Sequence, residues 1–257
     1  MADRETRRLS FGSVAADYDR YRPSPPPQAL DWLIPPDVQA VLDLAAGTGA
    51  VTRELIGRAA RVIAVEPDER MRTALTARCP EAEVLPGRGE DIPLPDASVD
   101  AVVISAAWHW LDPEQAVPEI ARVLRVGGTL GVIRISWDMR APWVAELRAL
   151  DREPRGADRP PDRDRGQRRE VRFPPGSPMS PVETLTVEYS RPVTKDDLVG
   201  LLGTYSQVIT LGPEQQADLS RRARALLDRQ PWDRRELPQI CRCQRSTRLP
   251  GPPTGNA

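Results

Sequence analysis

The chain has 257 residues, a formal net charge of −1, 28% charged residues and only 5% aromatic residues. This length is enough for one large or two small domains with a substantial core. The balanced charge gives no reason to expect a nucleic-acid partner or an anionic membrane, and no run approaches the ~20 apolar residues of a membrane span.

Export and metal binding are not expected either. Residues 1–13 are charged and contain no apolar stretch, so we expect no signal peptide and a cytoplasmic protein. Cys79, Cys241 and Cys243 do not have the spacing of metal ligands, and we expect them to be small apolar residues in a reduced compartment. On a strand, Cys241 and Cys243 would point the same way. We therefore expect no metal ion.

The segment before the first strand, residues 1–36, is expected to form short helices interrupted by prolines. Val14, Tyr18 and Tyr21 fall on one side of a helix that ends at Pro23. After the run of prolines, one more turn of helix can form before the chain enters the first strand.

A buried strand that leads into a glycine turn comes next. The run from Ala40 to Leu44 is apolar except for Asp43, which is typical of a parallel strand covered on both faces. Gly47 and Gly49 allow a sharp turn that can bring the backbone close to a ligand. Helical spacing over 50–58 predicts a helix that starts at this turn. We therefore expect a ligand site at the carboxyl end of the strand, where open α/β sheets bind ligands.

One missing glycine and two carboxylates indicate which ligand this site could bind. A dinucleotide-binding motif has a third glycine where this chain has Thr52. Asp43 disfavours a pyrophosphate and favours a cationic ligand, although it could also serve only to cap the turn. Glu66 ends the second strand, 23 residues after Asp43, where a carboxylate can accept hydrogen bonds from both ribose hydroxyls. That spacing fits an adenosine as well as a dinucleotide and does not choose between them.

Strands and helices continue to alternate through residue 135. Asp68 is expected to cap a helix that runs to about Arg78. Further strands are expected over 82–85, 98–105 and 129–135, with an amphipathic helix over 113–124. This alternation predicts an α/β fold with a doubly wound, mostly parallel sheet.

The fourth expected strand ends just before the tryptophan–histidine–tryptophan run at Trp108, His109 and Trp110. His109 is the only histidine of the chain. A neutral imidazole at a strand's carboxyl end can accept a proton from a substrate, but it can equally orient its own loop. The two tryptophans can form an apolar wall that excludes water.

The second half of the chain is less regular. From Asp151 to Arg172 it is rich in Arg, Asp and Pro, so we expect an exposed or disordered loop; a basic nucleic-acid segment is the alternative, and the interleaved acids disfavour it. Thr194 and Asp197 predict a capped helix. Strands are expected over 182–189 and 237–243, and a helix over 211–227. The last residues, 246–257, are expected to be disordered.

Four motifs in register resemble those of the class I S-adenosylmethionine-dependent methyltransferases, in the small-molecule branch related to methyltransferase type 11 and trans-aconitate methyltransferases. They are the pattern Asp43-x-Ala45-x-Gly47-x-Gly49, the acid Glu66, the loop 87–96 and the turn 122–130, in which Val126 replaces the family's proline. The resemblance implies a Rossmann-like core with a late antiparallel strand pair. It also implies S-adenosylmethionine as cofactor and a small-molecule methyl acceptor.

The resemblance also implies roles for particular residues. Cofactor contacts are implied for Tyr18, Arg22, Asp43, Ala45, Gly47, Gly49, Glu66, Met71, Gly89, Glu90 and Ser105. Acceptor contacts are implied for Tyr18, Trp108, His109 and Trp110, with His109 as the candidate catalytic base. Arg88 stands where many relatives carry an acid, so the adenine contact falls to Glu90, to the backbone at Gly89 or to Asp91.

The amino-terminal pattern Tyr18-x-x-x-Arg22-Pro23 resembles the lid of small-molecule methyltransferases. There, Arg22 would pair with the cofactor carboxylate and Tyr18 would lie near the transferred methyl group. The alternative reading is a packing tyrosine and a surface arginine.

These expectations divide the chain by function. The segments are a lid (1–36), a cofactor-binding core (37–137), a charged proline-rich loop (138–181), a part that completes the sheet and covers the acceptor (182–245), and a tail (246–257). The expected activity is methyl transfer to an oxygen, nitrogen or carbon nucleophile by a monomer or homodimer. The alternatives are a non-catalytic binding protein of the same fold and an NAD-type oxidoreductase.

Overall fold

The computed structural model describes residues 10–150 and 170–251, which fall into two compact units. The core unit comprises Ser24–Arg134, Asp164–Val187 and Cys241–Ala257, and the helical unit comprises Met1–Pro23, Ile135–Arg163 and Glu188–Ile240. The segments predicted from the sequence divide the chain by function rather than by compactness, and they stay predictions.

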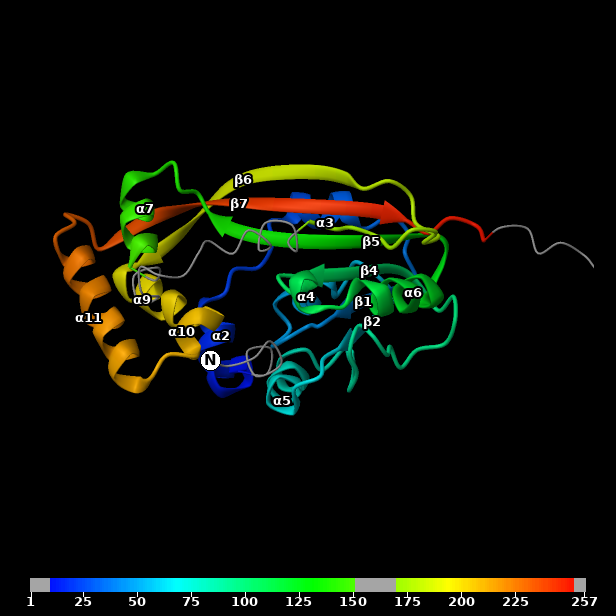
Figure 1. The fold of residues 1–257 in the computed structure, drawn as a ribbon, viewed down its shortest axis with the longest axis horizontal. Coiled ribbons are helices and arrows are strands. Elements are labelled where there is room, and N and C mark those ends of the chain that lie inside the picture. The colour runs from blue at the N-terminus through cyan, green and yellow to red at the C-terminus, as the bar shows by residue number, and fades with distance from the viewer. Residues whose placement is uncertain (1–9, 151–169, 252–257) are drawn as a thin grey trace, which may run out of the picture. The chain divides into compact units, whose positions relative to one another are not determined.

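The described residues contain one sheet with the strand order β3-β2-β1-β4-β5-β7-β6 (Figure 1). The strands are β1 (Ala40–Leu44), β2 (Arg61–Val65), β3 (Glu83–Leu85), β4 (Val99–Ser105), β5 (Leu124–Trp137), β6 (Glu183–Thr194) and β7 (Arg234–Thr247). The first five are parallel to one another, and the late pair is antiparallel. The predicted Rossmann-like α/β fold is therefore confirmed.

The strand order reverses between β1 and β4. The chain leaves β1 toward β2 on one side and returns from β3 to β4 on the other. In open α/β sheets, ligands bind outside the carboxyl ends of the strands at such a switch point. The topology therefore selects the ends of β1 and β4 as the place for the site.

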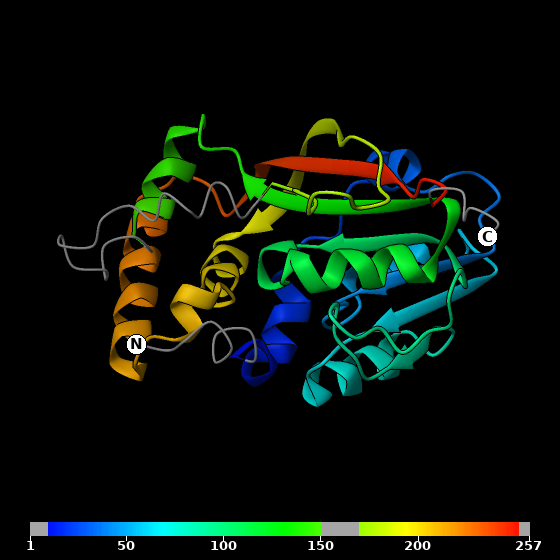
Figure 2. The same ribbon diagram turned by 45° about the vertical axis from the view of Figure 1, so that its right-hand side comes forward.

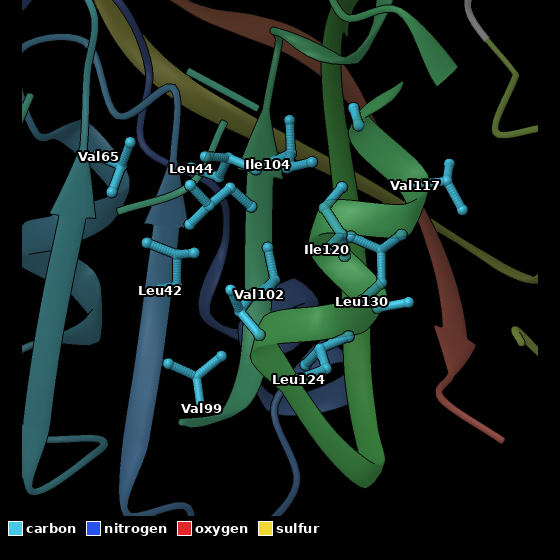
Figure 3. Close-up of a cluster of buried hydrophobic side chains, with 14 of the residues drawn as sticks. Leu42, Leu44, Val65, Val99, Val102, Ile104, Val117, Ile120, Leu124 and Leu130 are labelled. Atoms are coloured by element: carbon cyan, nitrogen blue, oxygen red, sulfur yellow. The ribbon is translucent and has the colours of Figure 1, made fainter. Parts of the chain in front are cut away.

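An apolar core holds helix α6 (Pro113–Val123) against one face of the parallel strands (Figure 3). Leu42 and Leu44 of β1 point to this face, as do Val102 and Ile104 of β4, and Ile120 of α6 packs over them. Each of these side chains is fully buried, which is worth about 1.5–3 kcal/mol per residue. Asp112 begins the helix by accepting a hydrogen bond from the N–H of Glu114.

The opposite face of these strands carries α3 (Pro27–Leu33), α4 (Ala50–Leu55) and α5 (Glu69–Arg78). Leu33 of α3 lies against Gly131 of β5, and Thr52 of α4 reaches Asp43 of β1. Helices therefore cover both faces of the parallel part of the sheet (Figure 2), which explains why β1 is buried along its whole length.

The helical unit has its own apolar core. It contains a 3-10 turn (Ser10–Val14), α2 (Ala15–Tyr21), α7 (Pro142–Ala149), α9 (Lys195–Gly203), α10 (Ser206–Ile209) and α11 (Pro213–Asp228). Leu198 and Leu227 pack with Trp137 and Trp143 in that core. The predicted start of α9 is confirmed, because Thr194 and Asp197 form a reciprocal capping box.

Several details of the predicted elements are corrected. The segment 138–181, predicted to be a loop, begins with helix α7, whose Trp143, Val144 and Leu147 are buried. Residues 108–110, predicted to be a loop, form the short 3-10 helix η2 (Trp108–Trp110). Strand β7 continues through the first two residues of the predicted tail. The rest of that tail beyond residue 251, and most of the predicted disordered loop, lie outside the described residues. Among the described helices, none is long and apolar enough to cross a membrane.

Candidate functional site

Two alanines adopt left-handed backbone conformations directly beyond the switch-point strands. Ala45 follows β1 with a φ of 59°, and Ala106 follows β4 with a φ of 56°. Their N–H groups donate to the carbonyls of Val65 (2.8 Å) and Ile133 (2.9 Å), so both segments turn sharply while they stay tied to the neighbouring strand. A non-glycine residue pays about 1–2 kcal/mol for this conformation, and such strain concentrates at functional sites.

The glycine turn also uses left-handed backbone, at Gly47 (φ 59°) and Gly49 (φ 88°). A Cβ atom at Gly49 would lie 2.8 Å from Cδ1 of Leu75 and 3.1 Å from Sγ of Cys79. At Gly49 the missing side chain therefore makes room for α5, and the close approach to a ligand expected from the sequence stays a prediction.

Glu66 ties the turn to the end of β2. It is only 6% exposed. Its Oε2 accepts a hydrogen bond from the Gly47 N–H, and its Oε1 accepts one from the Asp68 N–H, both at 2.9 Å. Burial raises the pKa of this carboxyl despite those two bonds. Because each carboxylate oxygen can accept two hydrogen bonds, Glu66 keeps capacity for a ligand.

Asp43 is the second buried carboxylate at this edge and is 1% exposed. Its Oδ2 accepts a 2.6 Å hydrogen bond from the hydroxyl of Thr52. Burial raises its pKa to about 7, and the nearby charge of Glu66 contributes to the shift. A cationic ligand group would favour the ionised form of Asp43. Asp43 lies within β1, and its hydrogen bonds from the hydroxyl and the backbone N–H of Thr52 tie that strand to the first turn of α4, directly after the glycine turn.

Thr48, between the two glycines, was not selected from the sequence. It is 1% exposed, and its Oγ1 is buried without a hydrogen-bond partner among the described residues. A buried hydroxyl normally has a partner, because leaving it unpaired costs roughly 1–3 kcal/mol. Its place within a Gly-Thr-Gly turn was the sequence signal that could have identified it.

The residues expected on the adenine side lie at the ends of β2 and β3. Met71 is buried in the first turn of α5. Gly89 is also buried, and a Cβ atom there would lie 2.8 Å from Leu111. Oε1 of Glu90 accepts a 3.0 Å hydrogen bond from the Asp112 N–H at the start of α6. Arg88 is exposed.

The acceptor-side residues follow β4. Ser105 is the last residue of β4 and is half-buried. In η2, Trp108 is buried in the apolar core, whereas His109 and Trp110 are half-buried. The imidazole of His109 lies against the Trp110 indole, with ring centroids 4.7 Å apart. The packing of Trp108 identifies it as a core residue that positions η2.

Tyr18 and Arg22 belong to the helical unit. The guanidinium carbon of Arg22 lies 4.9 Å from the centre of the Tyr18 ring and 4.5 Å from the centre of the Tyr205 ring. Its Nε donates to the hydroxyl of Thr204 (3.0 Å), and its Nη2 donates to the Thr204 carbonyl (2.7 Å). Arg22 is thus held by α9 and its C-cap. The predicted contact of Arg22 with a cofactor carboxylate stays a prediction.

Known proteins resemble this chain over most of its length. The methyltransferase domain family matches residues 42–132. The uncharacterized methyltransferase Rv3342 of Mycobacterium tuberculosis is 41% identical over 243 residues, which cover 93% of this chain and 96% of that protein. A candidate type II methyltransferase of Anaeromyxobacter dehalogenans superposes with a TM-score of 0.64 at 27% identity, covering 90% of this chain and 99% of that one. Phosphoethanolamine N-methyltransferase 2 of Haemonchus contortus shares the fold, with a TM-score of 0.53 and 11% identity over 93% of this chain and 58% of its own.

Proposed function

The chain belongs to the class I S-adenosylmethionine-dependent methyltransferases, and on this premise we propose that it methylates an oxygen, nitrogen or carbon nucleophile of a small molecule. Its family excludes the alternative of an NAD-type oxidoreductase. The observation that supports the proposal most strongly is the pair of buried carboxylates, Asp43 and Glu66, at the switch-point edge.

The chemistry of this edge suits S-adenosylmethionine. When bound, that cofactor supplies an electrophilic methyl group on a sulfonium. Glu66 would accept hydrogen bonds from its ribose hydroxyls with the capacity left after the Gly47 and Asp68 N–H groups are satisfied. Asp43 would favour the positively charged amino acid portion. Thr48 would gain the hydrogen-bond partner that its buried hydroxyl lacks among the described residues.

Within the core unit, the remaining cofactor residues proposed from the sequence are Ala45, Gly47, Gly49, Met71, Gly89, Glu90 and Ser105. Tyr18 and Arg22 belong to the helical unit, and their roles stay predictions from the sequence. The left-handed turn at Ala45 is part of this proposal, because the strained backbone there directs the chain away from the sheet beside Asp43 and Glu66.

The protein's contribution to the reaction is mainly positional. Methyl transfer is an in-line displacement, and holding the reacting atoms about 3–3.5 Å apart in the correct direction can supply several kcal/mol. Trp110 and His109 would line the acceptor side, while Trp108 anchors their helix in the core. The left-handed turn at Ala106 sets where η2 begins relative to the end of β4.

We propose His109 as the general base for an acceptor whose nucleophilic atom carries a proton. For such an acceptor, His109→Ala should lower kcat by a thousandfold or more without changing cofactor affinity. An acceptor that reacts as a carboxylate needs no base, and the same substitution should then lower the rate by less than about tenfold. Single-turnover rates measured on both kinds of acceptor separate these two roles.

Calorimetric titration with S-adenosylmethionine and S-adenosylhomocysteine tests the proposal. We expect binding in about the micromolar range. Glu66→Gln should weaken it about tenfold or more, because a hydrogen bond to a charged group contributes about 1.5–3 kcal/mol. Glu83→Gln is the matched control: Glu83 is an exposed acid on β3 that pairs with Arg61 at 2.6 Å, and its removal should leave affinity unchanged. Absence of binding to the folded wild-type protein would contradict the proposal and favour a non-catalytic role.

A further inference from the structure

Two arginines face each other across neighbouring strands of the core unit. The Gly127 N–H donates to the Arg248 carbonyl, and the Arg248 N–H donates to the Gly128 carbonyl, which sets the antiparallel register of β5 and β7. Counting six residues along each strand from Gly128 and Arg248 places Arg134 directly opposite Arg242. Directly opposite side chains in antiparallel strands have Cβ atoms about 4.5–5.5 Å apart.

Neither guanidinium has a hydrogen bond or an ion pair within residues 10–150 and 170–251. Arg134 is half-buried and Arg242 is exposed. Burial lowers the pKa of Arg134, and the positive charge of Arg242 lowers it further. The negative charge of Glu170 opposes this shift only in part. Oε2 of Glu170 also lies 3.5 Å from Nη2 of Arg172. Like charges directly opposite each other destabilise a sheet, so this pair lowers the stability of the fold, and Glu170 offsets that loss only in part.

The arginine pair lies next to the edge that carries the proposed reaction. Arg134 follows Ile133, whose carbonyl accepts the N–H of Ala106, the strained residue just beyond β4. Because side chains alternate along a strand, Arg134 projects to the same face as Leu130 and Val132. Those two residues belong to the apolar core that also contains Trp108 of η2. The pair is therefore on the face of the sheet that packs against Trp108 of η2, the short helix that also contains His109.

We propose that Arg134 and Arg242 together bind an anionic group, a carboxylate or a phosphate, of the methyl acceptor. This inference rests on the proposed function and adds the chemical class of its substrate. Guanidinium groups bind carboxylates and phosphates through two parallel hydrogen bonds. An anion held between the two groups would also cancel their mutual repulsion. That gives a physical reason for two adjacent cations on this face.

The test measures thermal unfolding of the full chain with sodium malonate or sodium pyrophosphate, at an ionic strength kept constant with sodium chloride. Arg134→Gln and Arg242→Gln are compared with the wild type. Arg221→Gln is the matched control, since Arg221 is an exposed arginine of α11 that pairs with Asp218 at 3.0 Å. Titration with S-adenosylhomocysteine is run on the same samples.

Without added anion, we expect each of the two variants to raise Tm by about 1–3 °C, because either change removes the repulsion. The control should not raise it. With anion, the wild type and the control should be stabilised, and the two variants should need about tenfold more anion for the same shift. Affinity for S-adenosylhomocysteine should be the same in all four proteins. The anion that gives the larger shift identifies the acceptor group as a carboxylate or a phosphate.

Three results would overturn the inference. They are a lowered Tm in both variants, a wild type that responds to neither anion, and variants that respond as the wild type does. Each can occur in a protein that still binds S-adenosylhomocysteine. A protein that fails to bind S-adenosylhomocysteine contradicts the proposed function instead, and the response to anions is read independently of it.

Discussion

The pKa values of carboxyl groups are shifted in opposite directions at the two edges of the parallel sheet. At the amino edge, Oδ2 of Asp100 accepts hydrogen bonds from the N–H groups of Gln39 and Ala40, both at 2.9 Å, and Oδ1 pairs with Arg125. Burial alone would raise the pKa of Asp100, but the bonds from Arg125 and the two N–H groups lower it on balance. This carboxylate joins the start of β1 to β4.

The carboxyl edge is built differently. Asp43 is bonded to the neutral hydroxyl of Thr52 and lies close to a second acid, Glu66. Burial raises the pKa of both carboxyls. A carboxylate that is already paired with a cation stabilises the fold. In a buried acid such as Asp43, whose hydrogen bonds within the described residues come from Thr52 alone, burial disfavours the charged form until a cationic ligand binds. The contrast separates a structural acid from binding acids within one sheet.

The largest predicted change comes from removing the amino-edge acid. Asp100→Ala would leave two backbone N–H groups without their acceptor and Arg125 without its counter-charge. Because the site is partly exposed, we expect a loss of about 2–3 kcal/mol in the free energy of unfolding. Urea denaturation measures it. A loss below about 0.5 kcal/mol would show that Asp100 does not hold this edge together.

At the carboxyl edge, Asp43→Asn should have the opposite effect on stability. The folded protein keeps the Asp43 proton up to about pH 7, whereas the unfolded chain releases it near the ordinary aspartate pKa of 3.8. The folded state therefore binds more protons between these values, and wild-type stability falls as the pH rises through that window. The full difference between the two pKa values corresponds to a loss of at most about 4 kcal/mol in the free energy of unfolding.

Asp43→Asn removes the charge and keeps an acceptor for the Thr52 hydroxyl, so at pH 8 the variant should be more stable than the wild type by about 1–2 kcal/mol. Near pH 4 the two should be alike. Urea denaturation at both values measures the difference. A variant that is less stable at pH 8 would mean that Asp43 is already stabilised as an anion.

A smaller effect is expected from the strained backbone at the carboxyl edge. Ala106→Gly relieves a φ of 56° and should stabilise the protein by up to about 1 kcal/mol. The adjacent Ala107 has a φ of −117°, so Ala107→Gly should instead destabilise by about 0.5–1 kcal/mol. Thermal unfolding of the two variants compares them directly. Equal destabilisation by both would show that Ala106 is not strained.

The sequence predicts the carboxyl edge better than the helical unit. The apolar run that forms β1, the spacing of Asp43 and Glu66 and the cap at Asp68 are local signals, and the structure has each element where the pattern indicates. The left-handed turn at Ala106 has no such signal, because alanine does not favour that conformation. Helix α7 was missed because its flanking charged and proline-rich residues suggested a loop.

Contacts between residues far apart in the chain could not be predicted at all. Arg22 reaches Thr204 across 182 positions, and the Arg134–Arg242 pair depends on the register of two strands that the sequence alone does not align. The Asp43 pKa likewise depends on burial by several elements together. Such features follow from tertiary packing, which composition and periodicity do not encode.

Titration of Asp43→Asn and Asp100→Asn with S-adenosylhomocysteine at pH 8 tests the contrast between the two edges most directly. We expect Asp43→Asn to weaken binding about tenfold or more in a protein that is at least as stable as the wild type. We expect Asp100→Asn to bind within about twofold of the wild type in a protein that is less stable. Undiminished binding by Asp43→Asn, or an equal loss of affinity in both folded variants, would contradict the assignment of Asp43 to binding and Asp100 to structure.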